Sequence, residues 1–107
     1  MAKYLVQVAY ATESWAAITK HPQNRIEQIR PAIEKLGGRV DDGYLCFGEY
    51  DLVTIVDFPD NVSAAAFALA VGSTGSCSAY KTTPLMTMSE AVQAMEKASD
   101  TGYTPPK

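Results

Sequence analysis

The stretch RVDDGYLCFGEYDLVTIVDF, residues 39–58, contains two runs of apolar, aromatic and β-branched residues on either side of a glycine. Such runs predict two strands, one over Arg39–Phe47 and one over Tyr50–Phe58. Gly48 and Glu49 lie between them, and a Gly-X pair is favoured in a two-residue type II′ hairpin turn. The stretch therefore predicts an antiparallel strand pair closed by a tight turn.

The sequence before this hairpin predicts a strand followed by a helix. Lys3–Tyr10 is rich in β-branched and aromatic residues, as strands are. Large apolar residues then recur at three- and four-residue spacing and predict one helical face, formed by Ile26, Ile29, Ile33 and Leu36. Gly37 predicts the end of this helix, and Pro31 predicts a kink or a restarted helix inside it. A shorter helix is expected over Glu13–Lys20.

The chain after the hairpin predicts a helix, a strand and a second helix. Val62–Val71 is apolar nearly all round, which indicates burial on more than one side, and Asp60 or Asn61 is its expected N-cap. Cys77–Met86 predicts the fourth strand. The segment TMSE at residues 87–90 is a capping box that begins a C-terminal helix. The apolar stripe of that helix comprises Met88, Ala91, Val92, Met95 and Ala98.

This order, βαββαβ and one further helix, predicts an α+β protein with the ferredoxin-like fold, in which helices cover one face of a four-stranded antiparallel sheet. Both faces of the predicted strands are rich in apolar residues, whereas a face in contact with water is expected to be polar. We therefore expect the uncovered face to pack on a second copy of the chain, giving a homodimer or higher oligomer. Residues 1–99 are expected to form the domain, and residues 100–107 a flexible tail.

Composition excludes several classes of function. With 107 residues the chain fits one domain. A net charge of −3 and a pI near 5.0 offer no basic surface for nucleic acid or an anionic membrane. The longest apolar run, Ala64–Val71, is far shorter than the roughly 20 residues that span a bilayer. Cys46 and Cys77 have no C-x-x-C spacing, so two reduced thiols in a cytoplasmic protein are the expected state.

The sequence resembles the GYD domain family. The resemblance rests on GEYDLVTIV at Gly48–Val56, which contains the glycine, tyrosine and aspartate of the family name, and on EKLGGRV at Glu34–Val40. AAAFALAVGSTG at Ala64–Gly75 and the initial KYLVQVAY agree with it, and together they cover roughly residues 2–98. The resemblance implies an architecture similar to the dimeric α/β-barrel superfamily, in which two ferredoxin-like sheets pack on each other. The resemblance does not indicate which reaction, if any, the protein catalyses.

His21, Tyr50 and Asp51 are the candidates for proton transfer. His21 is the only histidine, and its alternative is an exposed loop position before Pro22. Tyr50 and Asp51 are neighbours in a predicted strand, so their side chains point to opposite faces and are not expected to act on one atom within a subunit. Tyr50 is alternatively a packing residue opposite Phe47.

Tyr50, Asp51 and Cys46 are also the candidates for ligand binding. The Asp51 carboxylate is expected either to pair with a backbone donor or a neighbouring subunit, or to lie at a pocket. Cys46 faces Asp51 in the predicted hairpin and is alternatively a core residue. One histidine and two separated cysteines give no metal-ligand spacing, so neither a metal site nor a cofactor is expected.

Three hypotheses for function remain. The first is a small oligomeric protein that binds a small apolar or aromatic molecule, or a regulatory module of that kind. The second is a cofactor-independent enzyme, similar to a monooxygenase or an isomerase, with Asp51, Tyr50 or His21 in a cavity between the sheet and the helices. The third is a structural assembly subunit with a filled core. We favour the first because the sequence contains no triad, metal set or nucleotide-binding loop.

Overall fold

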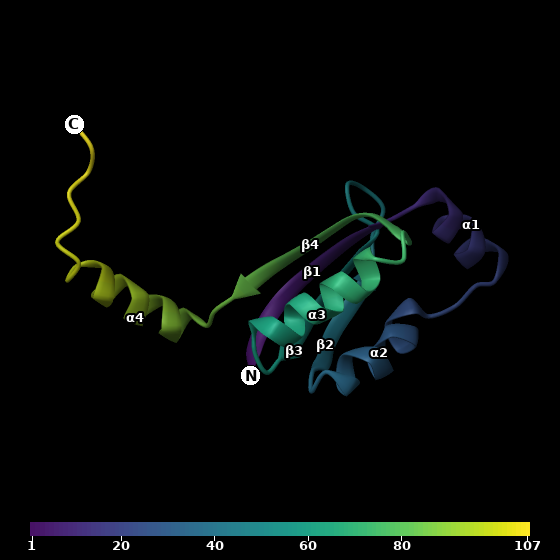
Figure 1. The fold of residues 1–107 in the computed structure, drawn as a ribbon, viewed down its shortest axis with the longest axis horizontal. Helices are drawn as coiled ribbons and strands as arrows, with labels where there is room; N and C mark the ends of the chain where they lie inside the picture. The colour runs from purple at the N-terminus through teal and green to yellow at the C-terminus, as the bar shows by residue number, and fades with distance from the viewer.

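Four antiparallel strands form one sheet in the order β2-β3-β1-β4 in the computed structural model, which describes residues 1–107 (Figure 1). The strands are β1 (Ala2–Tyr10), β2 (Arg39–Leu45), β3 (Leu52–Phe58) and β4 (Cys77–Leu85). The helices are α1 (Thr12–Lys20), α2 (Arg25–Lys35), α3 (Asn61–Gly72) and α4 (Met88–Ala98). The strand order and the position of α2 and α3 on one face confirm the predicted ferredoxin-like fold.

The core lies between this helix face of the sheet and the two helices α2 and α3. Side chains alternate along a strand, and the buried set on β1 and β3 follows that alternation: Tyr4, Val6, Val8, Leu52, Thr54, Val56 and Phe58. The main cluster joins Tyr4, Val56 and Phe58 to residues of α2, β2 and α3, namely Ile33, Val40, Ala64 and Phe67, whereas Val6, Val8 and Leu52 form a second, smaller cluster. The predicted apolar stripe of α2 is confirmed, since Ile26, Ile29 and Leu36 pack against the core around Ile33.

Helix α2 ends at a glycine, as the sequence predicts. Gly37 has a φ of +80°, a left-handed conformation that favours glycine, and the Gly38 N–H donates to the Ile33 carbonyl at 3.0 Å. A Cβ on Gly38 would lie 2.7 Å from the Asp57 carbonyl oxygen. The glycine pair therefore both ends the helix and lets the chain pass close to β3. Pro31 lies inside α2, which is one helix and is not restarted there.

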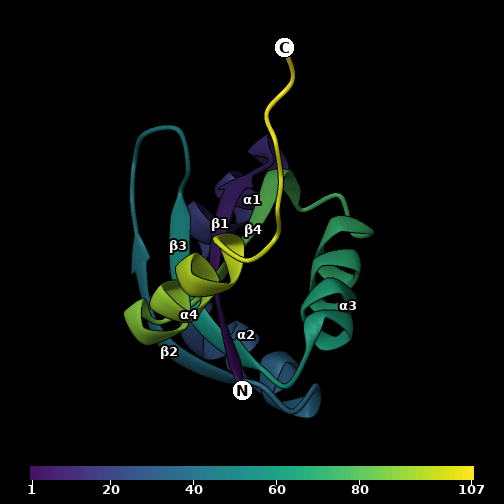
Figure 2. The same ribbon diagram turned by 90° about the vertical axis from the view of Figure 1, so that its left-hand side faces the viewer.

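The predicted two-residue turn is wrong. The connection between β2 and β3 is a six-residue loop, Cys46–Asp51, that stands out from the sheet (Figure 2). Gly48 lacks the positive φ that a type II′ turn requires. Phe47, predicted to pack on Tyr50, is 97% exposed. Cys46 still faces Asp51 as predicted, since the Cys46 N–H donates to the Asp51 carbonyl at 2.7 Å, and the Asp51 N–H donates to the Val8 carbonyl at 2.8 Å.

Helices α3 and α4 are less buried than the sequence predicts. The prediction that α3 is buried on more than one side is wrong: Ala64 and Phe67 are buried, but Val62 and Leu69 are 78% and 72% exposed. The capping box of α4 is confirmed, with Thr87 and Glu90 bonded reciprocally. Nevertheless α4 leads away from the sheet, and none of its residues is buried (Figure 1).

The position of α4 makes the molecule long. Its radius of gyration is 17.1 Å, against about 13 Å for a compact domain of this length. Met88, Val92 and Met95, on the predicted apolar stripe, are all exposed. None of the four helices has the length and apolar character that a membrane span requires.

Candidate functional site

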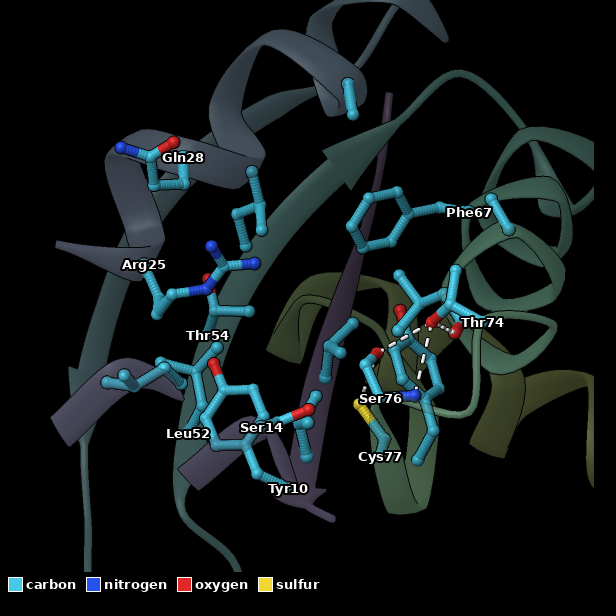
Figure 3. Close-up of a pocket in the computed structure, with 18 of the residues that line it drawn as sticks. Tyr10, Ser14, Arg25, Gln28, Leu52, Thr54, Phe67, Thr74, Ser76 and Cys77 are labelled. Atoms are coloured by element: carbon cyan, nitrogen blue, oxygen red, sulfur yellow. Dashed lines mark hydrogen bonds between the residues drawn. The ribbon is translucent and has the colours of Figure 1, made fainter. Parts of the chain in front are cut away.

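A cavity of about 680 Å³ lies between the helix face of the sheet and the helices α1, α2 and α3 (Figure 3). Of its 23 lining residues 15 are hydrophobic, so its walls are mainly apolar. The floor consists of β-strand residues: Val6, Val8, Leu52, Thr54 and Tyr80. This size and character are those of small-molecule sites, which occupy roughly 300–1,000 Å³ and are mostly apolar.

The cavity exists because small residues face it from the helices. Ala32 of α2, Ala17 of α1, and Ala66 and Ala70 of α3 all line it. Alanines leave space where leucine or isoleucine would fill a core, and protein interiors are otherwise close-packed. Phe67 is the one large side chain that α3 directs into the cavity (Figure 3).

The polar groups in the cavity come mainly from the end of β1 and the start of α2. The Arg25 guanidinium and the Tyr10 hydroxyl both point into it (Figure 3). Arg25 Nη1 donates to Gln23 Oε1 at 2.8 Å, whereas Arg25 Nε is buried and has no hydrogen-bond partner. Buried polar groups are nearly always paired, so this nitrogen is an exception among the polar atoms at the cavity wall.

Burial controls the protonation of the two tyrosines in the cavity. It raises the pKa of Tyr10, and the neighbouring Arg25 opposes this shift without cancelling it. It also raises the pKa of Tyr80 on β4. Both hydroxyls therefore remain protonated at neutral pH and are available as hydrogen-bond donors.

A smaller cavity of about 250 Å³ adjoins the first. It lies toward the hairpin loop, with Trp15, Gly43 and Leu45 among its lining residues. Tyr10 and Arg25 line both cavities. These two side chains therefore form part of the wall between the two spaces.

Asp51 lies outside both cavities and has structural partners. Its Oδ2 accepts hydrogen bonds from the Tyr10 backbone N–H at 2.9 Å and from the Trp15 indole N–H at 3.1 Å. The Tyr10 and Trp15 rings pack edge to face with centroids 5.4 Å apart. The carboxylate thus joins the hairpin loop to the connection between β1 and α1. This is the backbone-donor alternative that the sequence left open.

The other candidates from the sequence also lie away from the cavity. The Cys46 thiol donates to the Tyr50 carbonyl at 3.1 Å within the hairpin loop. His21 is an exposed residue at the C-terminal end of α1, where its N–H donates to the Ala17 carbonyl at 2.9 Å. The structure brings Tyr50, Asp51 and Cys46 together in one loop and does not place His21 with them.

Sequence reasoning did not identify Tyr10, Arg25 or Tyr80 as site residues, although two signals were present. Tyr10 continues the inward series Tyr4, Val6 and Val8 at strand spacing. Arg25 is four residues before Ile29, so it is on the inward face of α2. A cation on the inward face of a helix is unusual enough to indicate a site.

Comparison with known families supports the resemblance seen in the sequence. Residues 4–95 match the family model of the GYD domain. The chain belongs to the GYD domain family. No curated protein and no solved structure matches it. The GYD motif of this chain, Gly48, Tyr50 and Asp51, lies in the hairpin loop, where Asp51 anchors the loop to β1.

Proposed function

We propose that this GYD domain protein binds a small apolar or aromatic molecule in the cavity between α2, α3 and the sheet. The observation that carries the proposal is the cavity itself: about 680 Å³, mainly apolar, with the Arg25 and Tyr10 side chains directed into it. A ligand with a flat or extended apolar body would contact Val6, Val8 and Phe67. Burying that body supplies the main driving force for binding.

The cavity supports binding more strongly than it supports the enzyme alternative. No aspartate, glutamate or histidine is among its lining residues, and the two tyrosines have raised pKa values. A cofactor-independent monooxygenase or isomerase needs a base that is ready to accept a proton near neutral pH. The size of the cavity also argues against a purely structural assembly subunit, for which a filled core is expected.

Blocking the cavity tests the proposal. Ala66 lines the cavity and its neighbour Ala65 is exposed and does not, so Ala66→Trp fills the space while Ala65→Trp is a matched control. We expect naphthylacetamide and naphthylacetate to bind the wild type and A65W in calorimetric titration, and A66W to lose binding. Equal binding by A66W and the wild type, or no binding of either compound by the wild type, would contradict the proposal.

We also infer that the chain forms a homodimer through the open face, meaning the sheet face opposite the helices. The apolar residues of the open face are Leu5, Ala9, Tyr44, Val53 and Ile55, with Gln7, Asp42 and Lys81 beside them. Only 12 of 107 residues are buried in the single chain, which is a small core for a domain of this length. Covering the open face with a second copy enlarges the buried apolar surface.

Charged residues flank these apolar residues at one end. Asp57 is buried, and it pairs with Lys3 at 3.0 Å and with Arg39 at 2.8 Å. Burial acts to raise the pKa of Asp57, but the hydrogen bonds from Lys3 and Arg39 outweigh it and lower that pKa. Asp41 also pairs with both cations. Asp42 and Lys81 also lie on the open face and form no ion pair within the chain, so both charges would meet the partner.

The area of the open face and of α4 suits a dimer. Four strands about 4.8 Å apart and about seven residues long give a face of roughly 19 by 23 Å. The exposed stripe of α4 extends this surface, and the two together are of the order of the ~800 Å² that each partner buries in a stable complex. A twofold axis would let the same surfaces cover each other. Because both cysteines are free, we place this dimer in the cytoplasm.

A further inference from the structure

We propose that the ligand of the cavity carries a carboxylate, and that Arg25 binds it while the apolar body lies between α2 and α3. This inference rests on the proposed binding function and specifies its ligand as a small apolar carboxylic acid. It follows from the charge of the cavity wall, the unpaired donor on Arg25 and the position of the Tyr10 hydroxyl.

The charged groups of the cavity wall all have one sign. Arg25 and Lys35 line it, and no lining residue is acidic. The chain as a whole has a net charge of −3, so the cationic cavity is a local feature opposite to the overall charge. Lys35 is exposed and Arg25 is half-buried, so Arg25 is the cation that an anion in the cavity would meet away from bulk water. The wall therefore favours an anionic ligand over a neutral or cationic one.

The hydrogen bonds of Arg25 leave unpaired the side of the guanidinium that suits a carboxylate. Nη1 is bound to Gln23, which fixes the orientation of the group, whereas Nε is buried without a partner. Nε and the adjacent Nη form a planar fork that binds both oxygens of a carboxylate through parallel hydrogen bonds. Nε is buried here, so the guanidinium must turn toward the cavity for this fork to reach the ligand.

The Tyr10 hydroxyl supplies a second donor beside this fork. Its ring is at the end of β1, and its hydroxyl points toward the same part of the cavity as the guanidinium (Figure 3). Protonated at neutral pH, it can donate to a carboxylate oxygen that Arg25 already holds. Val8, Ile29 and Phe67 also line the cavity and offer apolar contacts to the rest of the ligand. The arrangement suits an acid whose polar group is at one end.

A matched pair of probes tests this inference. Naphthylacetate and naphthylacetamide have the same apolar body and differ in the charged group. By calorimetric titration at neutral pH, we expect the wild type to bind the acid about 10- to 100-fold more tightly than the amide, the range that a charge-assisted hydrogen-bonded pair provides. Arg25→Gln should remove this preference by weakening the binding of the acid to about that of the amide. Arg30→Gln removes a cation of the same helix that does not line the cavity, and this control should keep the preference.

Arg25→Lys distinguishes the fork from the charge, because it should retain only part of the preference for the acid. Binding of the amide reports that each variant is folded. Equal affinity of the wild type for acid and amide would overturn the carboxylate inference and leave the proposed binding function standing. A preference that survives in Arg25→Gln would also overturn it. No binding of either probe would overturn both.

Discussion

The Asp51 carboxylate joins three segments that are distant in sequence. It accepts hydrogen bonds from the Tyr10 backbone and the Trp15 indole, and its own N–H donates to Val8. These contacts hold the hairpin loop against the end of β1, where Tyr10 directs its side chain into the cavity. The aspartate of the GYD motif in this chain therefore positions a wall of the site without contacting the space itself.

Removal of this carboxylate tests its structural role. Asp51→Ala leaves the Tyr10 and Trp15 donors without an acceptor, and hydrogen bonds to a charged group contribute about 1.5–3 kcal/mol each. We expect the free energy of unfolding to fall by about 2–4 kcal/mol, measured in urea. Asp51→Asn keeps an acceptor oxygen and should cost less. Glu49→Ala in the same loop is the control and should change stability by less than about 0.5 kcal/mol.

A different result would contradict the structural role of Asp51. If Asp51→Ala were as stable as Glu49→Ala and yet failed to bind naphthylacetamide, Asp51 would be part of the binding machinery rather than an anchor.

Among the elements, the contact between the end of α2 and β3 depends on Gly38. An added Cβ there would lie 2.7 Å from the Asp57 carbonyl oxygen, and a backbone atom cannot move aside as a flexible side chain can. Gly72, at the end of α3, has no atom within 4 Å of the corresponding position. The two glycines therefore differ in their surroundings and provide a matched test.

Gly38→Ala is expected to lower the free energy of unfolding by about 1–3 kcal/mol, as overpacked sites do. Gly72→Ala should leave stability unchanged or raise it by up to about 1 kcal/mol, because alanine favours the helix. Chemical denaturation of both variants measures the difference. Equal stability of the two variants would show that the approach of α2 to β3 is looser than the structure indicates.

Local patterns were sufficient to predict the elements and their inward faces. Strand alternation is consistent with the burial of Leu52, Thr54 and Val56 on one face of β3, and helical spacing predicted the apolar face of α2 that includes Ile33. Both depend only on neighbours in the chain. The form of the hairpin loop was missed because Asp51 is held by the backbone of β1 and by the Trp15 indole, which no local pattern around Gly48 reveals.

The cavity could not be predicted for a related reason. Its volume depends on the separation of α2 and α3 across the sheet, and hence on small residues that are far apart in sequence, such as Ala32 and Ala66. Tyr10 and Arg25 were visible as inward positions, but their meeting depends on that same tertiary arrangement. Sequence patterns place a residue on a face, and only the packed fold shows what it meets there.

At the scale of the whole molecule, the open face and α4 are the surfaces that the single chain leaves uncovered. The sequence predicted that the open face and one stripe of α4 are apolar. In the structure neither surface packs against the core of the chain. The helices occupy the opposite face of the sheet, and α4 begins only after β4 has ended. A second copy is the partner that the proposal assigns to them.

Light scattering at micromolar concentration tests the proposed dimer. We expect a mass twice the 11.5 kDa of the chain. Ile55→Lys places a charge in the centre of the open face and should give a monomer, because an unpaired charge is costly to bury. Leu69→Lys, on the exposed side of α3, should remain dimeric. A wild-type mass of 11.5 kDa would exclude the dimer.

The crystal structure of this protein with naphthylacetate is the measurement that tests the central claim most directly. The account predicts electron density for the probe between α2 and α3, with both carboxylate oxygens at hydrogen-bonding distance from Arg25 and the rings against Phe67. A cavity left empty at saturating probe concentration, or a probe bound in the hairpin loop beside Tyr50 and Cys46, would contradict it.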